Sequence, residues 1–121
     1  MFVGTFDGNG YTISNLNINS DTANYGLFGV VGSGATITDL TIEDFTIDGT
    51  AANSGFLIGS IVGTSGGDPI TISDITVNGG TNTVSVVNAE NERTDAFVGG
   101  IVGQVSGAAK VNFVDIVVKN V

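Results

Sequence analysis

The chain has 121 residues and contains neither cysteine nor histidine. Without cysteine there is no disulfide and no thiolate ligand, and without histidine there is no imidazole ligand and no nucleophile activated by an imidazole base. Proline occurs once. No apolar run approaches the ~20 residues that a membrane-spanning helix requires. The sequence therefore excludes the commonest metal and hydrolase sites and predicts no membrane insertion.

Basic residues are also scarce. Three Lys and Arg residues stand against 12 Asp and Glu residues, which gives a net charge of −9. Nucleic acids and anionic membranes repel such a chain, so neither is a predicted partner. The acidic balance suits a salty medium or divalent cations, and Ca²⁺ remains the one open cofactor alternative. Asp7-Gly8-Asn9-Gly10 lacks the spacing and terminal Glu of an EF-hand loop, and we predict a turn there.

The residues that are abundant favour strands. There are 19 Gly, hydrophobic residues make up 41% of the chain, and charged residues make up only 12%. Val, Ile and Thr dominate, whereas strong helix formers are scarce and no segment keeps a helical period. The length fits one domain. We therefore predict a single all-β domain over residues 1–121.

Two short patterns recur in a fixed order. The first reads apolar, x, Asn or Asp, Leu or Ile, x, apolar; it covers Ile13–Ile18, Ile37–Ile42, Ile72–Val77 and Phe113–Val118, with an overlapping fifth copy at Ile42–Ile47. The second is a glycine-spaced apolar run at Leu27–Gly29, Ile61–Gly63 and Ile101–Gly103, preceded by Gly26, Gly59 and Gly99. Each run comes before a copy of the first pattern, which predicts a repeat unit of at least two strands.

The Asn or Asp in the first pattern is predicted to form a corner. Leu40 and Ile42 are two residues apart and share one face of a strand, but Ile37 is three residues from Leu40. Burying all three requires a bend at Asp39, and Asn and Asp tolerate left-handed backbone angles well. We expect a corner column, meaning equivalent residues of successive strands about 4.8 Å apart and close to solvent; its members are Asn15, Asp39, Asp74 and Asp115.

The spacing between these corners grows along the chain, and we place the growth in two insertions, Glu43–Ser54 and Asn78–Ala96. Val84, Val86 and Val87 predict a further strand inside the second insertion. A polar stretch without an apolar anchor follows them and is the predicted contact loop for a glycan, another surface or Ca²⁺. Its candidate residues are Glu90, Asn91, Glu92, Arg93 and Asp95. A Thr- and Asn-rich face is the alternative contact surface.

The stretches FVGTFDGNGYTISNLNI and YGLFGVVGSGATITDLTI resemble the GLUG-motif repeats of bacterial surface proteins. Gly26-Leu27-Phe28-Gly29 matches the signature, and the later copies at Gly59–Gly63 and Gly99–Gly103 depart from it. The resemblance implies a right-handed parallel β-solenoid, found in adhesins and in accessory regions of secreted enzymes, and it brings no catalytic residues. The repeat copies themselves predict about four rungs. Because no polar capping repeat or amphipathic cap helix is visible, we expect uncapped ends that invite pairing with another chain.

The predicted function is a structural or adhesive repeat module of an extracellular bacterial surface protein or filament, without catalysis. The expected partners are flanking repeats or identical subunits stacked end to end, with a surface glycan as a further candidate. No signal peptide follows Met1, so the chain is either cytoplasmic or a segment of a longer secreted protein, and the repeats favour the segment. Binding of glycan or Ca²⁺ through residues 78–96 is one alternative.

A carbohydrate-active enzyme is a further alternative. Stacked Asp39 and Asp74 would meet the carboxylate spacing of about 5–10 Å that glycoside hydrolysis needs. A lyase commonly needs Lys or Arg to neutralise an acidic substrate, and Arg93, Lys110 and Lys119 are few and late in the chain. We therefore expect no enzymatic activity.

Overall fold

The computed structural model describes residues 1–20, 24–49, 53–84 and 97–121. In these ranges all regular secondary structure is β-strand, which confirms the all-β prediction. The strands are β1 (Thr5–Asp7), β2 (Thr12–Ser14), β3 (Asn17–Ser20), β4 (Asn24–Tyr25), β5 (Phe28–Gly32), β6 (Thr36–Gly49), β7 (Asn53–Gly55), β8 (Ile58–Gly63), β9 (Ile70–Val84), β10 (Phe97–Gly99), β11 (Val102–Gly107) and β12 (Val111–Lys119). The described ranges hold no helix with the length and apolarity to cross a membrane.

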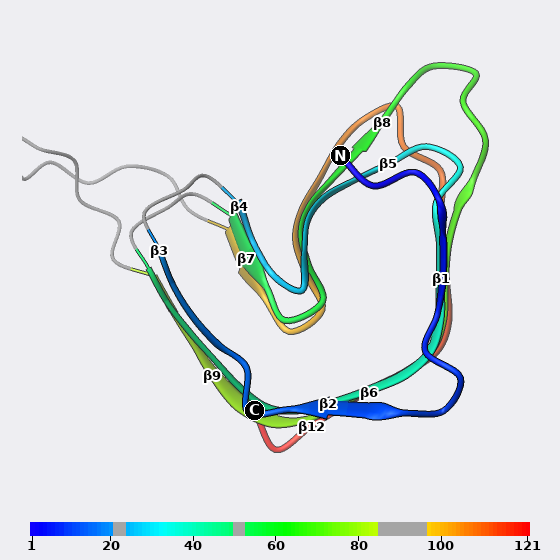
Figure 1. The fold of residues 1–121 in the computed structure, drawn as a ribbon. Helices are drawn as coiled ribbons and strands as arrows, with labels where there is room; N and C mark the ends of the chain where they lie inside the picture. The colour runs from blue at the N-terminus through cyan, green and yellow to red at the C-terminus, as the bar shows by residue number, and fades with distance from the viewer. Residues whose placement is uncertain (21–23, 50–52, 85–96) are drawn as a thin grey trace, which may run out of the picture.

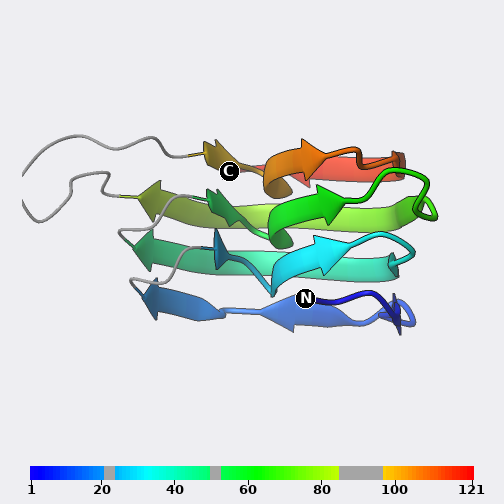
Figure 2. The ribbon, with the colours of Figure 1, turned by 90° about the horizontal axis from the view of Figure 1, so that it is seen from above.

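The strands form three sheets, and every strand pair is parallel. One sheet has the order β1-β6-β9-β12, with β2 and β3 also paired to β6, and the others have the orders β4-β7-β10 and β5-β8-β11. Each pass of the chain therefore adds one strand to each sheet in turn: β4, β5, β6, then β7, β8, β9, then β10, β11, β12. The passes overlie one another in Figure 1 and appear as stacked layers in Figure 2.

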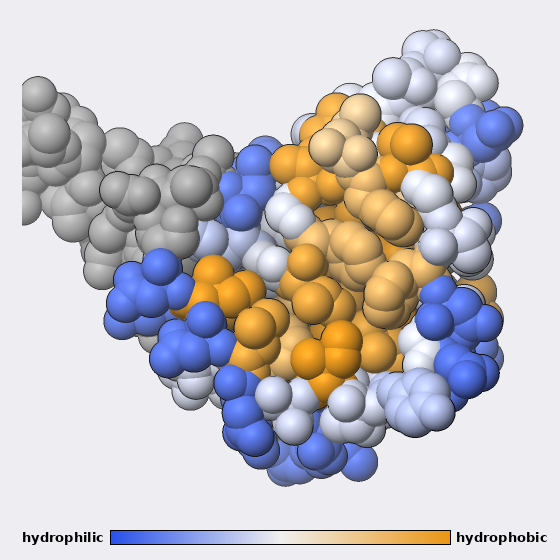
Figure 3. Space-filling model, in the orientation of Figure 1, coloured by the Kyte–Doolittle hydropathy of each residue, from blue (hydrophilic) through white to orange (hydrophobic). Residues whose placement is uncertain are grey.

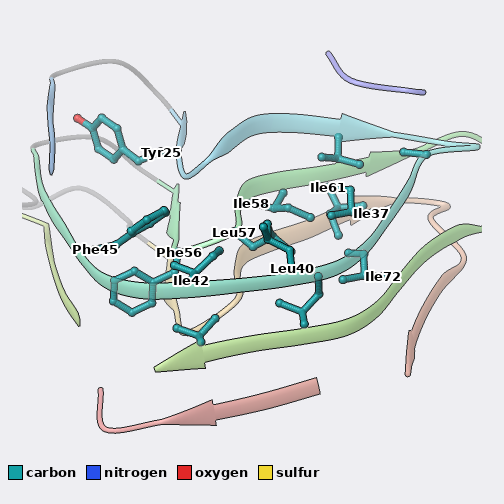
Figure 4. Close-up of a cluster of buried hydrophobic side chains, with 14 of the residues drawn as sticks. Tyr25, Ile37, Leu40, Ile42, Phe45, Phe56, Leu57, Ile58, Ile61 and Ile72 are labelled. Carbon is teal, nitrogen blue, oxygen red and sulfur yellow. The ribbon is translucent and has the colours of Figure 1, made fainter. Parts of the chain in front are cut away.

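The register stacks like residues on like. Phe6 pairs with Ile37, Ile37 with Ile72, and Ile72 with Phe113. The two middle members, Ile37 and Ile72, are fully buried because both neighbouring strands carry a bulky side chain at the same position. Each such burial contributes roughly 1.5–3 kcal/mol. Figure 4 shows these side chains between β6 and β9 on one side and β8 on the other.

The bend predicted at Asp39 is present. Ile37, Leu40 and Ile42 are all buried although their spacing does not fit a single strand face. Asp39 has φ 59°, in the left-handed region. That angle reverses the alternation of side chains, so β6 turns a corner without leaving the sheet. The strand then continues to Gly49, paired with β9 along its length.

Two predicted insertions are wrong in their described parts. Glu43–Gly49 belongs to β6, where Glu43 pairs with β2, Thr46–Gly49 pair with β3, and the opposite side pairs with β9. Asn78–Val84 belongs to β9. Both segments are regular strand because their residues continue the register of neighbouring passes. Residues 50–52 and 85–96 lie outside the described residues. A further strand was predicted from Val84, Val86 and Val87; Val84 is the last residue of β9, and Val86 and Val87 lie outside the described residues.

The glycine runs align in the structure differently from the predicted alignment. Phe28 and Val102 both pair with Ile58, which places Gly29, Gly59 and Gly103 in one column. Ile61–Gly63 is therefore not the counterpart of Leu27–Gly29, and its last residue pairs with Gly107 instead. The error arose because Ile58-Gly59 and Val62-Gly63 offer the same local pattern. Only the pairing of whole strands distinguishes them.

Both ends of the stack expose apolar side chains. At the N-terminal end, which faces the viewer in Figure 3, hydrophilic residues surround a hydrophobic centre. The partly buried side chains of the first two passes packed against the core are Phe2, Phe6, Ile13, Leu16, Ile18, Leu27 and Phe28. At the other end Phe113 is 47% exposed and Val118 is 40% exposed, whereas the preceding members of their columns are buried.

Candidate functional site

The predicted corner column divides into two columns. Asp39, Asp74 and Asp115 occupy equivalent positions, since the residues on both sides of each are paired in register. All three have positive φ, between 53° and 59°. Asn15 is also left-handed, with φ 60°. It does not belong with them, because Ser14 pairs with Glu43 and Asn17 with Thr46, which places Asn15 opposite Asp44.

Asn15 therefore begins a second corner column that the sequence analysis missed. Its members are Asn15, Asp44, Gly79 and Asn120, and all have positive φ. The overlapping repeat copy at Ile42–Ile47 was the available signal, since it is the counterpart of Ile13–Ile18. Gly79 breaks the Asn/Asp pattern; a Cβ there would collide with the carboxylate of Asp44.

In the first pass a loop takes the place of the first corner. Asp7 pairs with Thr38 and Thr12 with Thr41. The four residues Gly8–Tyr11 therefore lie opposite only two residues of β6, Asp39 and Leu40. The amide of Gly8 donates to the carbonyl oxygen of Thr38 at 2.8 Å. The amide of Asn9 donates to Oδ1 of Asp7 at 2.8 Å. This confirms the predicted turn and explains why Asn15 was assigned to the wrong corner.

The corner carboxylates are exposed. Asp39, Asp44, Asp74 and Asp115 all lie on the outside of the sheet, facing solvent. Neighbouring members of a column are about 4.8 Å apart along the stack. Neighbouring carboxylates in such a row repel one another and can attract cations. The row is exposed, so no surrounding residues exclude water from the carboxyl groups. Among the described residues, no group of three or more acids lies close enough together to hold a metal ion.

The outer face of the largest sheet carries hydroxyl columns. Thr5, Thr36 and Thr71 stand in register in one column, and Thr12, Thr41 and Thr76 in another. The hydroxyl groups of Thr38 and Ser73 are 2.9 Å apart and hydrogen bond. At the last pass the pattern changes, since Val114 and Val117 take the positions of Ser73 and Thr76. The described part of the predicted Thr- and Asn-rich face is thus a polar surface on the first three passes, and it bends at the Asp39 corner between the two threonine columns.

A cavity of about 390 Å³ opens beside the end of β9. Its lining residues are Phe56, Gly80, Thr81, Asn82, Gly99, Gly100 and Val121. None of them is acidic or basic, and Phe56 is almost completely buried. Gly80 leaves room for the ring of Phe56, because a Cβ on Gly80 would lie 3.0 Å from ring carbons Cε1 and Cζ.

Asn82 is the one polar member of an inward apolar column. It stands in register with Ile47, which in turn pairs with Ile18. Its Oδ1 accepts a hydrogen bond from the hydroxyl of Ser54, and its Nδ2 donates to the carbonyl oxygen of Gly99 at 3.3 Å. These bonds tie β9 to β7 and β10. Asn82 was not among the predicted site residues, because nothing near it in sequence marks it as inward.

Two side-chain amides hydrogen bond to each other in the β4-β7-β10 sheet. Asn53 and Asn24 pair in register, and Nδ2 of Asn53 donates to Oδ1 of Asn24 at 2.8 Å. Oδ1 of Asn53 is buried without a hydrogen-bond partner in the structure as described. An unsatisfied buried acceptor of this kind costs about 1–3 kcal/mol.

The predicted contact loop lies outside the described residues, with its candidate residues Glu90, Asn91, Glu92, Arg93 and Asp95. Binding of Ca²⁺ or a glycan through this loop therefore stays a prediction.

The chain is similar to part of a much larger protein. Over 106 residues it is 41% identical to halomucin of Haloquadratum walsbyi; the match covers 87% of this chain but 1% of the length of halomucin. No family model matches the chain, so the resemblance to GLUG-motif repeats stays a prediction. No solved structure matches it either. The comparisons therefore relate this chain to a small stretch of halomucin.

Proposed function

We propose that this chain is a structural segment of a right-handed parallel β-solenoid in an extracellular surface protein, related to GLUG-motif repeats and acting without catalysis. In this role it is a stiff spacer whose ends associate with flanking repeats or with other copies. The observation that carries the proposal is the continuous register of inward apolar columns, which stops at two open apolar ends. Similarity to 1% of the length of halomucin agrees with a segment of a larger protein.

The outside of the molecule supports the same role. Corner carboxylates and threonine hydroxyls line the outer face of β6 and β9, which suits lasting contact with water. The similarity to halomucin supports a structural role at the cell surface.

The proposal predicts end-to-end association that depends on the C-terminal end. Phe113→Asp places a charge in the inward column of Ile37 and Ile72, so a neighbouring layer could no longer bury that position. We expect this variant to weaken concentration-dependent association at least tenfold, measured by light scattering after size-exclusion chromatography and by electron microscopy. Val114→Asp is the matched control, because Val114 is similarly exposed, at 49%, but points to the outside.

Circular dichroism must first show that both variants remain folded. If both variants lose association equally, the added charge alone explains the loss, and burial of the Phe113 column by a neighbouring layer does not. Monodisperse monomers of the unaltered chain at every concentration would contradict the filament form of the proposal.

A second candidate function is glycan binding on the outer face. The in-register threonine columns favour it, because regularly spaced hydroxyl groups can hydrogen bond to a repeating polysaccharide. Titration calorimetry and a glycan array with the unaltered chain, compared with Thr41→Val/Thr76→Val, would test it. Binding that does not depend on these two hydroxyl groups would point instead to the loop at Glu90–Asp95.

A further inference from the structure

The connection between β8 and β9 is longer than its counterparts in the neighbouring passes. It covers residues 64–69, whereas residues 33–35 join β5 to β6 and residues 108–110 join β11 to β12. In Figure 1 it projects beyond those connections, at the outer margin of the molecule. Its last two residues, Asp68 and Pro69, are both exposed. Because the sequence has one proline, this is the only Asp-Pro peptide bond in the chain.

Hydrogen bonds hold the chain in place on both sides of this peptide bond. The amide of Thr64 donates to Oγ of Ser33 at 3.1 Å, and the amide of Gly67 donates to the carbonyl oxygen of Thr64 at 3.0 Å. Gly67 also packs closely here, since a Cβ on it would lie 2.6 Å from the hydroxyl oxygens of Ser33 and Thr64. After the bond, the amide of Ile70 donates to the carbonyl oxygen of Lys110 at 2.8 Å.

A backbone amide of the second pass is bonded to the carbonyl group of the Asp-Pro bond itself. The N–H of Gly34 donates to the carbonyl oxygen of Asp68 at 3.1 Å. Gly34 has φ 88°, a left-handed angle that favours glycine. Donors about 2.7–3.1 Å from a carbonyl oxygen stabilise the negative charge that develops on it when the carbon is attacked. The fold thus places an oxyanion donor at this one peptide bond.

We propose that Asp68–Pro69 is a self-cleavage site, at which the carboxylate of Asp68 breaks the peptide bond that follows it. A carboxylate oxygen attacks the carbonyl carbon of the same residue and closes a five-membered ring. The C–N bond to Pro69 then breaks, its electron pair stays on the nitrogen, and the nitrogen takes up a proton from water. The cyclic anhydride left on Asp68 is opened by a second water molecule, which gives a free C-terminal aspartate.

Proline favours this step because its nitrogen belongs to a tertiary amide, which leaves more readily once it is protonated. The reaction is therefore faster in acid. Asp68 is the one titratable residue within residues 64–70, and residues 33–35 beside it carry no charge. On the other side Lys110 stands opposite Pro69, because the next residues, Val111 and Ile70, pair in register. The attacking carboxylate is thus the only acid that these three packed segments supply.

Cleavage at this place leaves the strands on both sides with all their neighbours. β8 remains paired with β5 and β11, and β9 remains paired with β6 and β12. Ile61 before the cut and Ile72 after it are both fully buried. We therefore expect the two pieces, residues 1–68 and 69–121, to stay associated after the bond has broken.

The test uses an internal reference. The full chain is extended after Val121 by Gly-Gly-Asp-Pro-Ile, which repeats residues 66–70 without their surroundings. Mass spectrometry under denaturing conditions follows both Asp-Pro bonds, in the most acidic buffer in which circular dichroism shows a folded chain and in the same buffer with urea. We expect the Asp68–Pro69 bond to break at least ~10-fold faster than the reference bond in the folded chain. In urea the two rates should be equal.

Equal rates in the folded chain, or slower cleavage at Asp68–Pro69, would overturn the proposal, because the fold would then add nothing to ordinary acid hydrolysis. Asp68→Asn removes the attacking carboxylate, and Pro69→Ala replaces the tertiary amide with a secondary one. We expect neither variant to break at this position while the reference bond still breaks. Cleavage there that persists in Asp68→Asn would show that another group attacks, and would also overturn the proposal.

Size-exclusion chromatography without denaturant tests the association of the two pieces. After cleavage we expect one particle that elutes like the uncut chain, because each strand beside the cut keeps both of its paired neighbours. Elution as two smaller pieces would contradict this part of the proposal.

Discussion

Backbone angles at single residues decide where this chain turns. In the described residues, every non-glycine residue with positive φ is Asn or Asp: Asn9, Asn15, Asp39, Asp44, Asp74, Asp115 and Asn120. Left-handed angles cost most L-residues about 1–2 kcal/mol, and Asn and Asp reduce the cost by bonding to the nearby backbone. Because Asn serves as well as Asp, the corners depend on conformation and not on charge.

Substitution of Asp74 tests this interpretation. Asp74→Asn should leave the free energy of unfolding within about 0.5 kcal/mol of the original, because the left-handed preference is kept. Asp74→Ala should lower it by about 1 kcal/mol, because alanine lacks the side-chain bond that favours this angle. Urea denaturation measures both. If the two variants lose equal stability, the carboxylate itself has a role.

Within the strands, close stacking of backbone on backbone decides where glycine is required. Gly29 and Gly59 stand in one column but have different surroundings. A Cβ on Gly59 would lie 2.7 Å from the amide nitrogen of Tyr25 and 2.8 Å from the carbonyl oxygen of Gly29. A Cβ on Gly29 would meet only the carbonyl oxygen of Asn24, at 3.7 Å. Gly59 lies in β8, which has β5 on one side and β11 on the other, whereas Gly29 lies in β5, at the edge of the same sheet.

Gly59→Ala should therefore destabilise the fold by about 1–3 kcal/mol or more, since backbone atoms must move to admit the methyl group. Gly29→Ala should be neutral or slightly stabilising, because it reduces the freedom of the unfolded chain without a clash. Thermal and urea denaturation of the pair would measure the difference. A similar decrease in the free energy of unfolding in both variants would show that glycine is needed for backbone conformation and not for close stacking.

Four of the 12 acidic residues, Asp39, Asp44, Asp74 and Asp115, lie at exposed corners of the folded chain. With a net charge of −9 and corner acids about 4.8 Å apart, folding brings like charges together. Salt shortens the Debye length from about 10 Å at 0.1 M to about 3 Å at 1 M and so screens this repulsion.

We expect the thermal midpoint to rise between 10 mM and 1 M NaCl. The rise should be smaller in Asp74→Asn, which removes the central charge of one corner column. Scanning calorimetry of both proteins across the salt series measures it. A midpoint that falls with salt would mean that attractive ion pairs outweigh the repulsion.

Much of the fold could be predicted from local patterns. The corner at Asp39 followed from the unequal spacing of Ile37, Leu40 and Ile42, because burial of all three leaves no other geometry. The mispredicted features were all matters of register. Asn15 was assigned to the first corner because the loop at Gly8–Tyr11 conceals the shift between the first two passes.

The sequence by itself determined the all-strand character, the apolar columns and the use of Asn or Asp at corners, since each depends on neighbouring residues and on strand geometry. Only the tertiary structure decided which copies stack on one another and where the cavity opens. The position of Asn82 illustrates the reason: its inward amide is satisfied by Ser54 and Gly99, which come from other strands. Such partners are brought together by the stacking of passes, and a sequence pattern cannot specify that register.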